Sequence, residues 1–122
     1  MANSPWGTID KVTRVAPNLA WVDTPSHGGL RVAQAWGQMN LSLAALSRAE
    51  RRHGYYWFEE DLAYALPCWE LRQLRPHLFA HRLGGQREAE RLATLADIDQ
   101  ELHQIITHWY PGYWREVDRT TA

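Results

Sequence analysis

A helical pattern near the C-terminus constrains the fold of this 122-residue chain more than any other feature. Apolar residues recur there at spacings of three and four, which places them along one face of a helix. They are Leu92, Leu95, Ile98, Leu102, Ile105 and Trp109. The pattern predicts a long helix over residues 86–108 that stops at Pro111-Gly112. Its apolar face is expected to lie across a sheet, with Trp109 closing the core.

Strand-like segments precede this helix. Residues 8–15 alternate imperfectly between apolar and polar side chains, and residues 19–24 form a second short apolar run. The intervening Ala16-Pro17-Asn18 favours the turn of an antiparallel hairpin, and residues 30–33 supply a third strand. Strands followed by helices predict one α+β domain over residues 1–122, with a small N-terminal antiparallel sheet of about three strands packed against C-terminal helices.

The segment after the predicted sheet is expected to be helical. Asn40 or Ser42 is a suitable N-cap for a helix that runs to about Arg52. Gly54 follows as a suitable left-handed terminator, because glycine adopts positive φ without steric cost.

Composition and charge disfavour several classes of function. The formal net charge of −1 gives no global field to attract nucleic acid, so nonspecific nucleic-acid binding is not expected. No apolar run approaches the roughly 18 residues that span a bilayer, so no membrane association is expected. Cys68 is the only cysteine, which excludes an internal disulfide and favours a reducing cytoplasm.

The abundance of tryptophan and arginine favours a recognition surface. The chain has seven tryptophans, and because Lys11 is the only lysine among thirteen basic residues, twelve are arginines. A GC-rich genome explains an arginine bias equally well, but these two residue types dominate interface hot spots. Near the C-terminus, Tyr113, Trp114 and Arg115 either fold back over the hairpin or contact a partner.

The segment Asp23-Thr24-Pro25-Ser26-His27-Gly28-Gly29 is the most distinctive loop. Its candidate binding residues are Ser26, His27, Gly28 and Gly29. The glycines permit unusual backbone angles that could cradle an anion, and the histidine is suited to acid, base or ligand roles near neutral pH. A tight hairpin connection without any ligand is the plainer interpretation.

The second candidate is the acidic triplet Glu59-Glu60-Asp61 beside Trp57. Carboxylates at the start of a helix suit its dipole, so a second helix is expected to begin at this triplet and to stop near Pro67. Desolvation and mutual repulsion are also the means by which proteins make a general acid. The triplet gains a functional meaning only where it meets His27, because a histidine with carboxylates can bind a divalent metal or share a proton.

Other motifs carry little chemistry. His77 and His81 stand four residues apart, but no HExxH motif accompanies them and no third ligand is evident, so no metal site is predicted there. The lone Cys68 is most simply a small buried hydrophobe. The chain has no P-loop, no GxGxxG and no GxSxG motif, and no cofactor is expected.

The order of these segments resembles an uncharacterised small domain family of bacterial phage, plasmid and mobile-element proteins. The resemblance rests on Trp6-Gly7, on the His-Gly-Gly loop at 24–29, on Trp57-Phe58-Glu59-Glu60-Asp61 and on Trp109-Tyr110-Pro111, and it covers most of the chain. It implies that His27 and the acidic triplet belong to one site. The sequence departs from the family at Phe58, where tyrosine is expected, and at Tyr110, where histidine often precedes proline.

Two hypotheses of function follow. The leading one is a small non-enzymatic binding protein of a phage or mobile element that acts in the cytoplasm of the bacterial host by contact with a protein partner. Inhibition of a host defence complex of the CRISPR type is its expected mode, and a homodimer is compatible with the sequence. The alternative is an enzyme, or a domain that binds a small anionic ligand, built on His27 with Glu59, Glu60 and Asp61.

Overall fold

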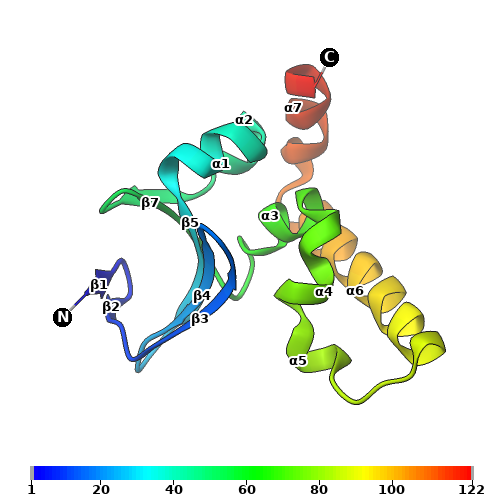
Figure 1. Ribbon diagram of the computed structural model, residues 1–122. Helices are drawn as coiled ribbons and strands as arrows, with labels where there is room; N and C mark the ends of the chain where they lie inside the picture. The colour runs from blue at the N-terminus through cyan, green and yellow to red at the C-terminus, as the bar shows by residue number, and fades with distance from the viewer. Residues whose placement is uncertain (1, 122) are drawn as a thin grey trace.

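Seven strands in two antiparallel sheets form the N-terminal half of the protein in this computed structural model, which describes residues 2–121 and the side chains of residues 2–118 (Figure 1). The main sheet has the order β3-β4-β5-β7-β6. Its strands are β3 (Lys11–Ala16), β4 (Leu19–Asp23), β5 (Gly28–Ala33), β6 (Glu50–Arg52) and β7 (Tyr55–Glu59). A small hairpin of β1 (Asn3–Ser4) and β2 (Gly7–Thr8) forms the second sheet.

The α+β class is confirmed, and so are the first three strands of the main sheet. Strands β3 and β4 pair antiparallel, and Asn18 in the turn between them has φ 72, a left-handed conformation that asparagine tolerates. The sequence underestimated the sheet, because it assigned residues 50–52 to a helix and did not assign β7. The turn between β6 and β7 is His53-Gly54, with φ 56 and 83, as in the type I′ turns that suit two-residue hairpins. Gly54 therefore closes a hairpin and does not end a helix.

Eight helical segments follow or interrupt the strands within the described residues. They are α1 (Gln34–Asn40), α2 (Leu43–Leu46), α3 (Ala65–Glu70), the 3₁₀ turn η1 (Arg72–Leu74), α4 (Arg75–Leu78), α5 (Ala80–Leu83), α6 (Glu88–Trp109) and α7 (Pro111–Thr121). Ser42 is the N-cap of α2, where its side chain accepts a hydrogen bond from the Ala45 N–H at 3.1 Å. The predicted cap is thus confirmed, although the helix is much shorter than expected.

Helix α6 has the predicted extent but not the predicted position. It packs against α3, α5 and α7, and Figure 1 shows α3 and α4 between α6 and the sheet. Its buried residues are Ile98, Leu102 and Ile106, whereas Leu92 and Trp109 are 62% and 57% exposed. The expectation that Trp109 closes the core is therefore wrong, because the short helices already cover the sheet and leave α6 only a narrow apolar contact.

The main core lies between one face of the sheet and the short helices. Leu30, Val32 and Phe58 contribute fully buried side chains from the sheet. The Trp21 indole N–H crosses this boundary and donates to the Leu78 carbonyl oxygen at 2.9 Å. This bond helps to orient α4 over the sheet, because a half-buried indole N–H without an acceptor would be costly.

Buried Arg75 joins three helices. Its guanidinium donates to the carbonyl oxygens of Cys68 and Trp69 at the C-terminus of α3, at 3.0 and 3.1 Å, and to Asp99 of α6 at 2.6 Å. Carbonyls in the last turn of a helix lack intrahelical partners, so this arginine satisfies two of them. The hydrogen bond from Arg75, and after it the charges of Arg75 and Arg72, hold the pKa of Asp99 below its usual value.

The lowered pKa of Asp99 predicts an acid sensitivity that Asp99→Asn removes. A depressed folded-state pKa contributes stability above the unfolded-state pKa, and this contribution is lost as the pH falls through the folded value. The difference in free energy of unfolding between the unmodified protein and Asp99→Asn should therefore be largest at neutral pH and shrink on acidification. Urea unfolding from about pH 7 to pH 3 measures this difference. The same change at the exposed Asp97 is the control, and a difference that stays constant with pH would contradict the role of Asp99.

Among the described residues, no helix combines the length and the apolar character that crossing a membrane requires.

Candidate functional site

Antiparallel pairing of β5 with β7 brings the two sequence candidates to one end of the sheet. Gly29 lies opposite Glu59, and Gly28 accepts a hydrogen bond from the Glu60 N–H at 3.0 Å. The turn before β5 and the turn after β7 therefore emerge side by side. The two motifs therefore meet through this strand pairing.

The turn that carries His27 is held by three hydrogen bonds to Thr24. The Thr24 N–H and hydroxyl both donate to the His27 carbonyl oxygen, at 2.8 and 2.7 Å, and the His27 N–H donates to the Thr24 hydroxyl at 3.1 Å. Pro25 and exposed Ser26 form the tip. Threonine and proline thus fix the backbone from which the imidazole projects.

His27, Glu59 and Asp61 form a compact cluster on the outer face of this sheet end. One nitrogen or oxygen atom from each side chain lies within 4.8 Å of those of the other two. The His27 Nδ1 and Glu59 Oε1 atoms are 3.8 Å apart, and these side chains are 49% and 45% exposed. The cluster combines one imidazole with two carboxylates and is open to solvent.

The acidic triplet does not begin a helix. Glu59 ends β7, residues 60–64 form turns, and α3 starts only at Ala65, with Pro67 in its first turn. The expected stop at Pro67 is wrong because an N–H in the first turn of a helix has no intrahelical acceptor, so proline is tolerated there. The triplet serves as a strand end and turn, which is why its members point to different faces of the sheet.

The two glycines after His27 lie inside β5 and are buried. Neither has positive φ among the residues described, so they do not form the unusual loop that the sequence suggested. A Cβ atom on Gly29 would lie 2.3 Å from the Phe58 carbonyl oxygen and 2.5 Å from the Trp6 ring. Glycine is required here because the Trp6 indole packs directly on the strand, as close backbone approaches demand.

A cavity of about 520 Å³, here called the sheet-end pocket, opens on the opposite face of the same sheet end. Its wall is aromatic, with Trp21 6.1 Å from Tyr64 and 6.5 Å from Phe79 between ring centroids. Burial, and after it the nearby Cys68 and Glu101, raise the pKa of the Tyr64 hydroxyl. The tyrosine therefore remains a neutral aromatic part of the wall.

Two carboxylates, Asp23 and Glu60, line the mouth of this pocket. An Asp23 oxygen and a Glu60 oxygen lie 3.2 and 3.0 Å from the point where a Cβ on Gly28 would stand, so the two carboxylates converge there. They come from β4 and from the residue after β7. The third member of the acidic triplet is thus used on the helix-covered face, while Glu59 and Asp61 belong to the outer face.

The basic residues at the pocket are Lys11, His81 and Arg82. Arg82 donates two hydrogen bonds to Glu101, at 2.7 and 3.0 Å, and these bonds also lower the pKa of the Glu101 carboxyl. Its charge is therefore offset within the protein. Lys11 lies opposite Asp23 in the β3–β4 register. The lining thus sets the carboxylates of Asp23 and Glu60 against Lys11 and against an arginine that Glu101 already engages.

The remaining candidates from the sequence lie elsewhere. Trp57 is 2% exposed, and its indole N–H donates to the Arg52 carbonyl oxygen at 2.8 Å. Tyr113 is fully buried. Trp114 packs on Trp69 and donates to the Thr107 hydroxyl at 3.1 Å, while Arg115 is exposed. These residues do not join the sheet-end cluster, and α7 folds back on α2 and α6, not on the hairpin.

Tyr110 is electrostatically linked to the cluster. Burial raises the pKa of its hydroxyl, and the charge of Glu59 raises it further, whereas Arg48 opposes both effects. The helix junction that carries Tyr110 is therefore near enough to sense the acidic turn.

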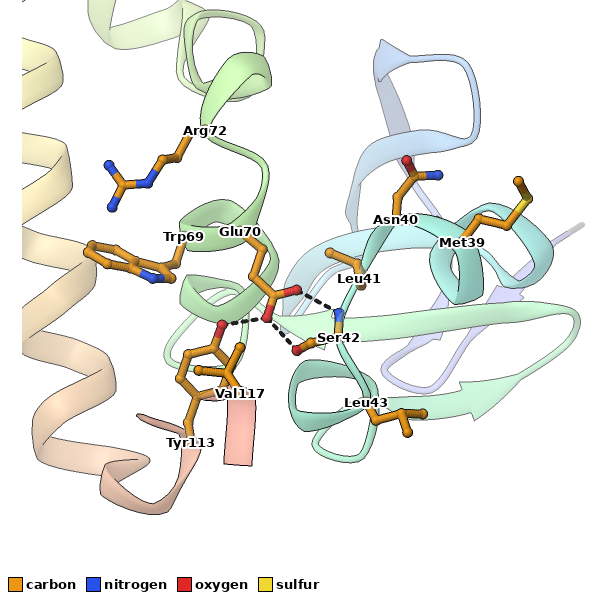
Figure 2. A pocket seen from close by; sticks show the side chains of 10 residues that line it. All are labelled: Met39, Asn40, Leu41, Ser42, Leu43, Trp69, Glu70, Arg72, Tyr113 and Val117. Atoms are coloured by element: carbon orange, nitrogen blue, oxygen red, sulfur yellow. Dashed lines mark hydrogen bonds between the residues drawn. The ribbon is translucent and has the colours of Figure 1, made fainter. Parts of the chain in front are cut away.

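A second cavity, of about 560 Å³, surrounds Glu70 (Figure 2). The Glu70 carboxylate accepts hydrogen bonds from the Ser42 N–H and hydroxyl, at 2.8 and 2.5 Å, and from the Tyr113 hydroxyl. Three protein donors thus converge on it, which makes Glu70 a structural link between α2, α3 and α7. No sequence signal identified this residue, because its partners are distant along the chain.

The sequence also missed most of the sheet-end pocket. Trp21 and Asp23 are two positions apart on β4, which places them on the same face of the sheet. This alternation could have predicted that the two side chains line one site. Tyr64, Phe79 and Arg82 come from turns and short helices, whose positions depend on tertiary packing.

Comparison with known proteins gives a family but no relative of known activity. A family model described as "Domain of unknown function (DUF7007)" matches residues 1–122. No curated protein and no solved structure matches the chain.

Proposed function

The chain thus belongs to the DUF7007 family, and we propose that it is a small non-enzymatic binding protein that acts by contact with a protein partner. We further propose that the sheet-end pocket receives a cationic side chain of that partner, preferably the guanidinium of an arginine.

The observation that carries this proposal is the pairing of an aromatic wall with two converging carboxylates. Trp21, Tyr64 and Phe79 offer ring surfaces, and a planar guanidinium stacks favourably on such surfaces. Asp23 and Glu60 offer charge-assisted acceptors at the mouth. An arginine side chain matches both parts, because its guanidinium has five donors in one plane.

Charge argues against a small anionic ligand. Four carboxylates, from Asp23, Glu59, Glu60 and Asp61, surround the sheet end, whereas the cations of the pocket are Lys11 and an Arg82 that is already paired with Glu101. An anion entering this region would meet like charge in a partly desolvated pocket. A cationic group would relieve the repulsion between the carboxylates.

The biological setting that fits is a phage or other mobile element. Complexes that bind nucleic acid, including host defence complexes, present rows of arginine and lysine to the phosphate backbone. A protein with an acidic sheet end, and with a sheet-end pocket that accepts an arginine, is suited to cover such a surface in the bacterial cytoplasm. It would then inhibit the complex to which the surface belongs. The partner would then be held by a few desolvated arginines, as hot-spot anchoring requires.

The proposal predicts that partner capture depends on the two pocket carboxylates. The double variant Asp23→Asn/Glu60→Gln should lose at least about tenfold in affinity, because arginine–carboxylate contacts that the partner desolvates on binding are worth more than about 1.4 kcal/mol. Tagged protein is incubated with lysate of the producing cell, and the bound proteins are quantified by mass spectrometry.

A matched control removes the same number of charges elsewhere. Glu88 and Glu90 are exposed in the first turn of α6, so Glu88→Gln/Glu90→Gln should capture the partner as the unmodified protein does. Circular dichroism and thermal unfolding verify that both double variants fold. Equal capture by the two double variants would exclude the pocket as the recognition site.

An enzyme built on His27 is the second candidate, favoured by the 3.8 Å separation of the His27 Nδ1 and Glu59 Oε1 atoms. Stoichiometry separates the two functions. A binding protein must be present at about the concentration of its target, whereas a catalyst acts at far lower concentration. An effect in the producing cell that persists at trace protein and disappears in His27→Ala would favour the enzyme.

A further inference from the structure

The cluster on the outer face of the sheet end has the composition of a metal site. We infer that His27, Glu59 and Asp61 bind a divalent first-row transition metal, such as Mn²⁺ or Zn²⁺. This site lies on the opposite face from the sheet-end pocket, and the inference does not depend on the proposed function.

The ligand set favours this class of cation. One imidazole nitrogen and two carboxylate oxygens make a mixed N/O set, which suits manganese, iron or zinc better than the all-oxygen shell preferred by calcium or magnesium. His27 supplies the nitrogen, and Glu59 and Asp61 supply the oxygens. Three protein ligands on one side would leave further positions for water or another molecule, as in open metal sites.

The distances permit coordination once the side chains rotate toward one another. The three donor atoms lie within 4.8 Å of one another, and the closest measured pair, His27 Nδ1 and Glu59 Oε1, is 3.8 Å apart. Two ligands at about 2.1 Å from one metal are at most about 4.2 Å apart. Three ligands on one side of the metal lie closer still, about 3.0–3.4 Å apart, so the exposed side chains of His27 and Asp61 need to close by up to about 1.8 Å through side-chain rotation.

The backbone that carries the ligands is already fixed. Three hydrogen bonds between Thr24 and His27 hold one turn, and the Glu59 carbonyl oxygen accepts from the Tyr64 N–H at 2.9 Å in the other. The backbone of the ligand residues therefore loses little conformational entropy when a metal binds.

Within the described part of the chain, no lysine or arginine forms an ion pair with Glu59 or Asp61. Among the described side chains, His27 is the only basic group that pairs with Glu59, at 3.8 Å. Two neighbouring carboxylates without a basic residue repel each other, and a divalent cation between them would remove this repulsion.

Isothermal titration of the full chain with MnCl₂ and with ZnCl₂ tests the inference. His27→Ala and Asp61→Asn should each weaken binding by about tenfold or more, because each removes one of three ligands. His108→Ala is the matched control, since His108 is exposed at the end of α6, where its ring contacts Trp109, and it should bind as the unmodified protein does. Circular dichroism verifies that the variants fold.

Mn²⁺ also reports the position of the site. The paramagnetic ion should broaden the backbone amide signals of Thr24, Ser26, His27 and residues 59–61 before those of α6. Failure of both ions to bind, unchanged binding by His27→Ala and Asp61→Asn, or broadening centred on His77 and His81 would overturn the inference.

Discussion

Replacing Tyr113 by alanine is expected to lower the free energy of unfolding by about 3–5 kcal/mol, as for other large aromatic side chains in cores. The ring is fully buried among α2, α3 and α7, and its hydroxyl donates to Glu70. Truncation leaves a cavity and removes one of the three donors that hold the Glu70 carboxylate. Urea unfolding followed by circular dichroism measures the loss.

Two variants separate the contributions of the ring and the hydroxyl. Tyr113→Phe keeps the ring and removes only the hydrogen bond, so it should cost about 1–3 kcal/mol. Trp109→Ala removes a larger aromatic ring that is 57% exposed, and it should change the free energy of unfolding by no more than about 1 kcal/mol. A smaller loss for Tyr113→Ala than for Trp109→Ala would contradict the buried position of α7.

Gly29→Ala is expected to destabilise the protein by about 3 kcal/mol, although a strand position normally favours alanine over glycine. The added methyl group would stand 2.3 Å from the Phe58 carbonyl oxygen and 2.5 Å from the Trp6 ring. The strand or the indole must therefore move. Urea unfolding measures the cost, and loss of the Trp6–Trp57 packing should appear in the near-ultraviolet circular dichroism.

Gly84→Ala is the matched control for this substitution. The nearest atom to a Cβ on Gly84 is the Ala80 carbonyl oxygen at 3.7 Å, which is ordinary contact. The same chemical change should therefore be neutral or slightly stabilising there. Trp6→Ala in the Gly29→Ala background should recover only part of the loss, because the backbone contact with Phe58 remains. Equal stability of the two alanine variants would contradict the close approach of both Phe58 and Trp6 to Gly29.

The long helix and the first hairpin could be predicted because their signals are local. The apolar spacing in α6 and the turn residues before β4 act over a few positions of the chain. The position of α6 could not be predicted, because it depends on the short helices α3–α5, whose weak patterns give no boundary. The same limit explains the error at Trp109, which continues the helical stripe but faces solvent.

The missed hairpin has a different cause. Strand β6 is a polar edge strand, and the spacing of Leu43, Leu46 and Ala49 before it continued a helical pattern. Strand β7 buries both faces, since Tyr56 and Phe58 face the core while the Trp6 hairpin covers Trp57. The polar alternation that marks a half-buried strand is therefore absent.

The candidate site was only partly accessible to the sequence. The residue types of His27 and the acidic triplet pointed to chemistry, and the pairing of β5 with β7 brings Glu59 and Asp61 to His27. The acidic triplet is divided between the two faces of the sheet because side chains alternate along a strand. Because residues 59–61 were expected at the start of a helix, this division was not predicted from the sequence.

The most direct test of the central claim is a nuclear magnetic resonance titration of the full chain with N-acetyl-L-arginine amide. If the sheet-end pocket binds an arginine side chain, the signals of the Trp21 indole N–H and of the Glu60 backbone amide should shift in a saturable manner. N-acetyl-L-citrulline amide, which has the same shape without the charge, should leave both signals in place, and Asp23→Asn/Glu60→Gln should abolish the response. Equal shifts with citrulline, or shifts confined to the cavity around Glu70, would contradict the claim.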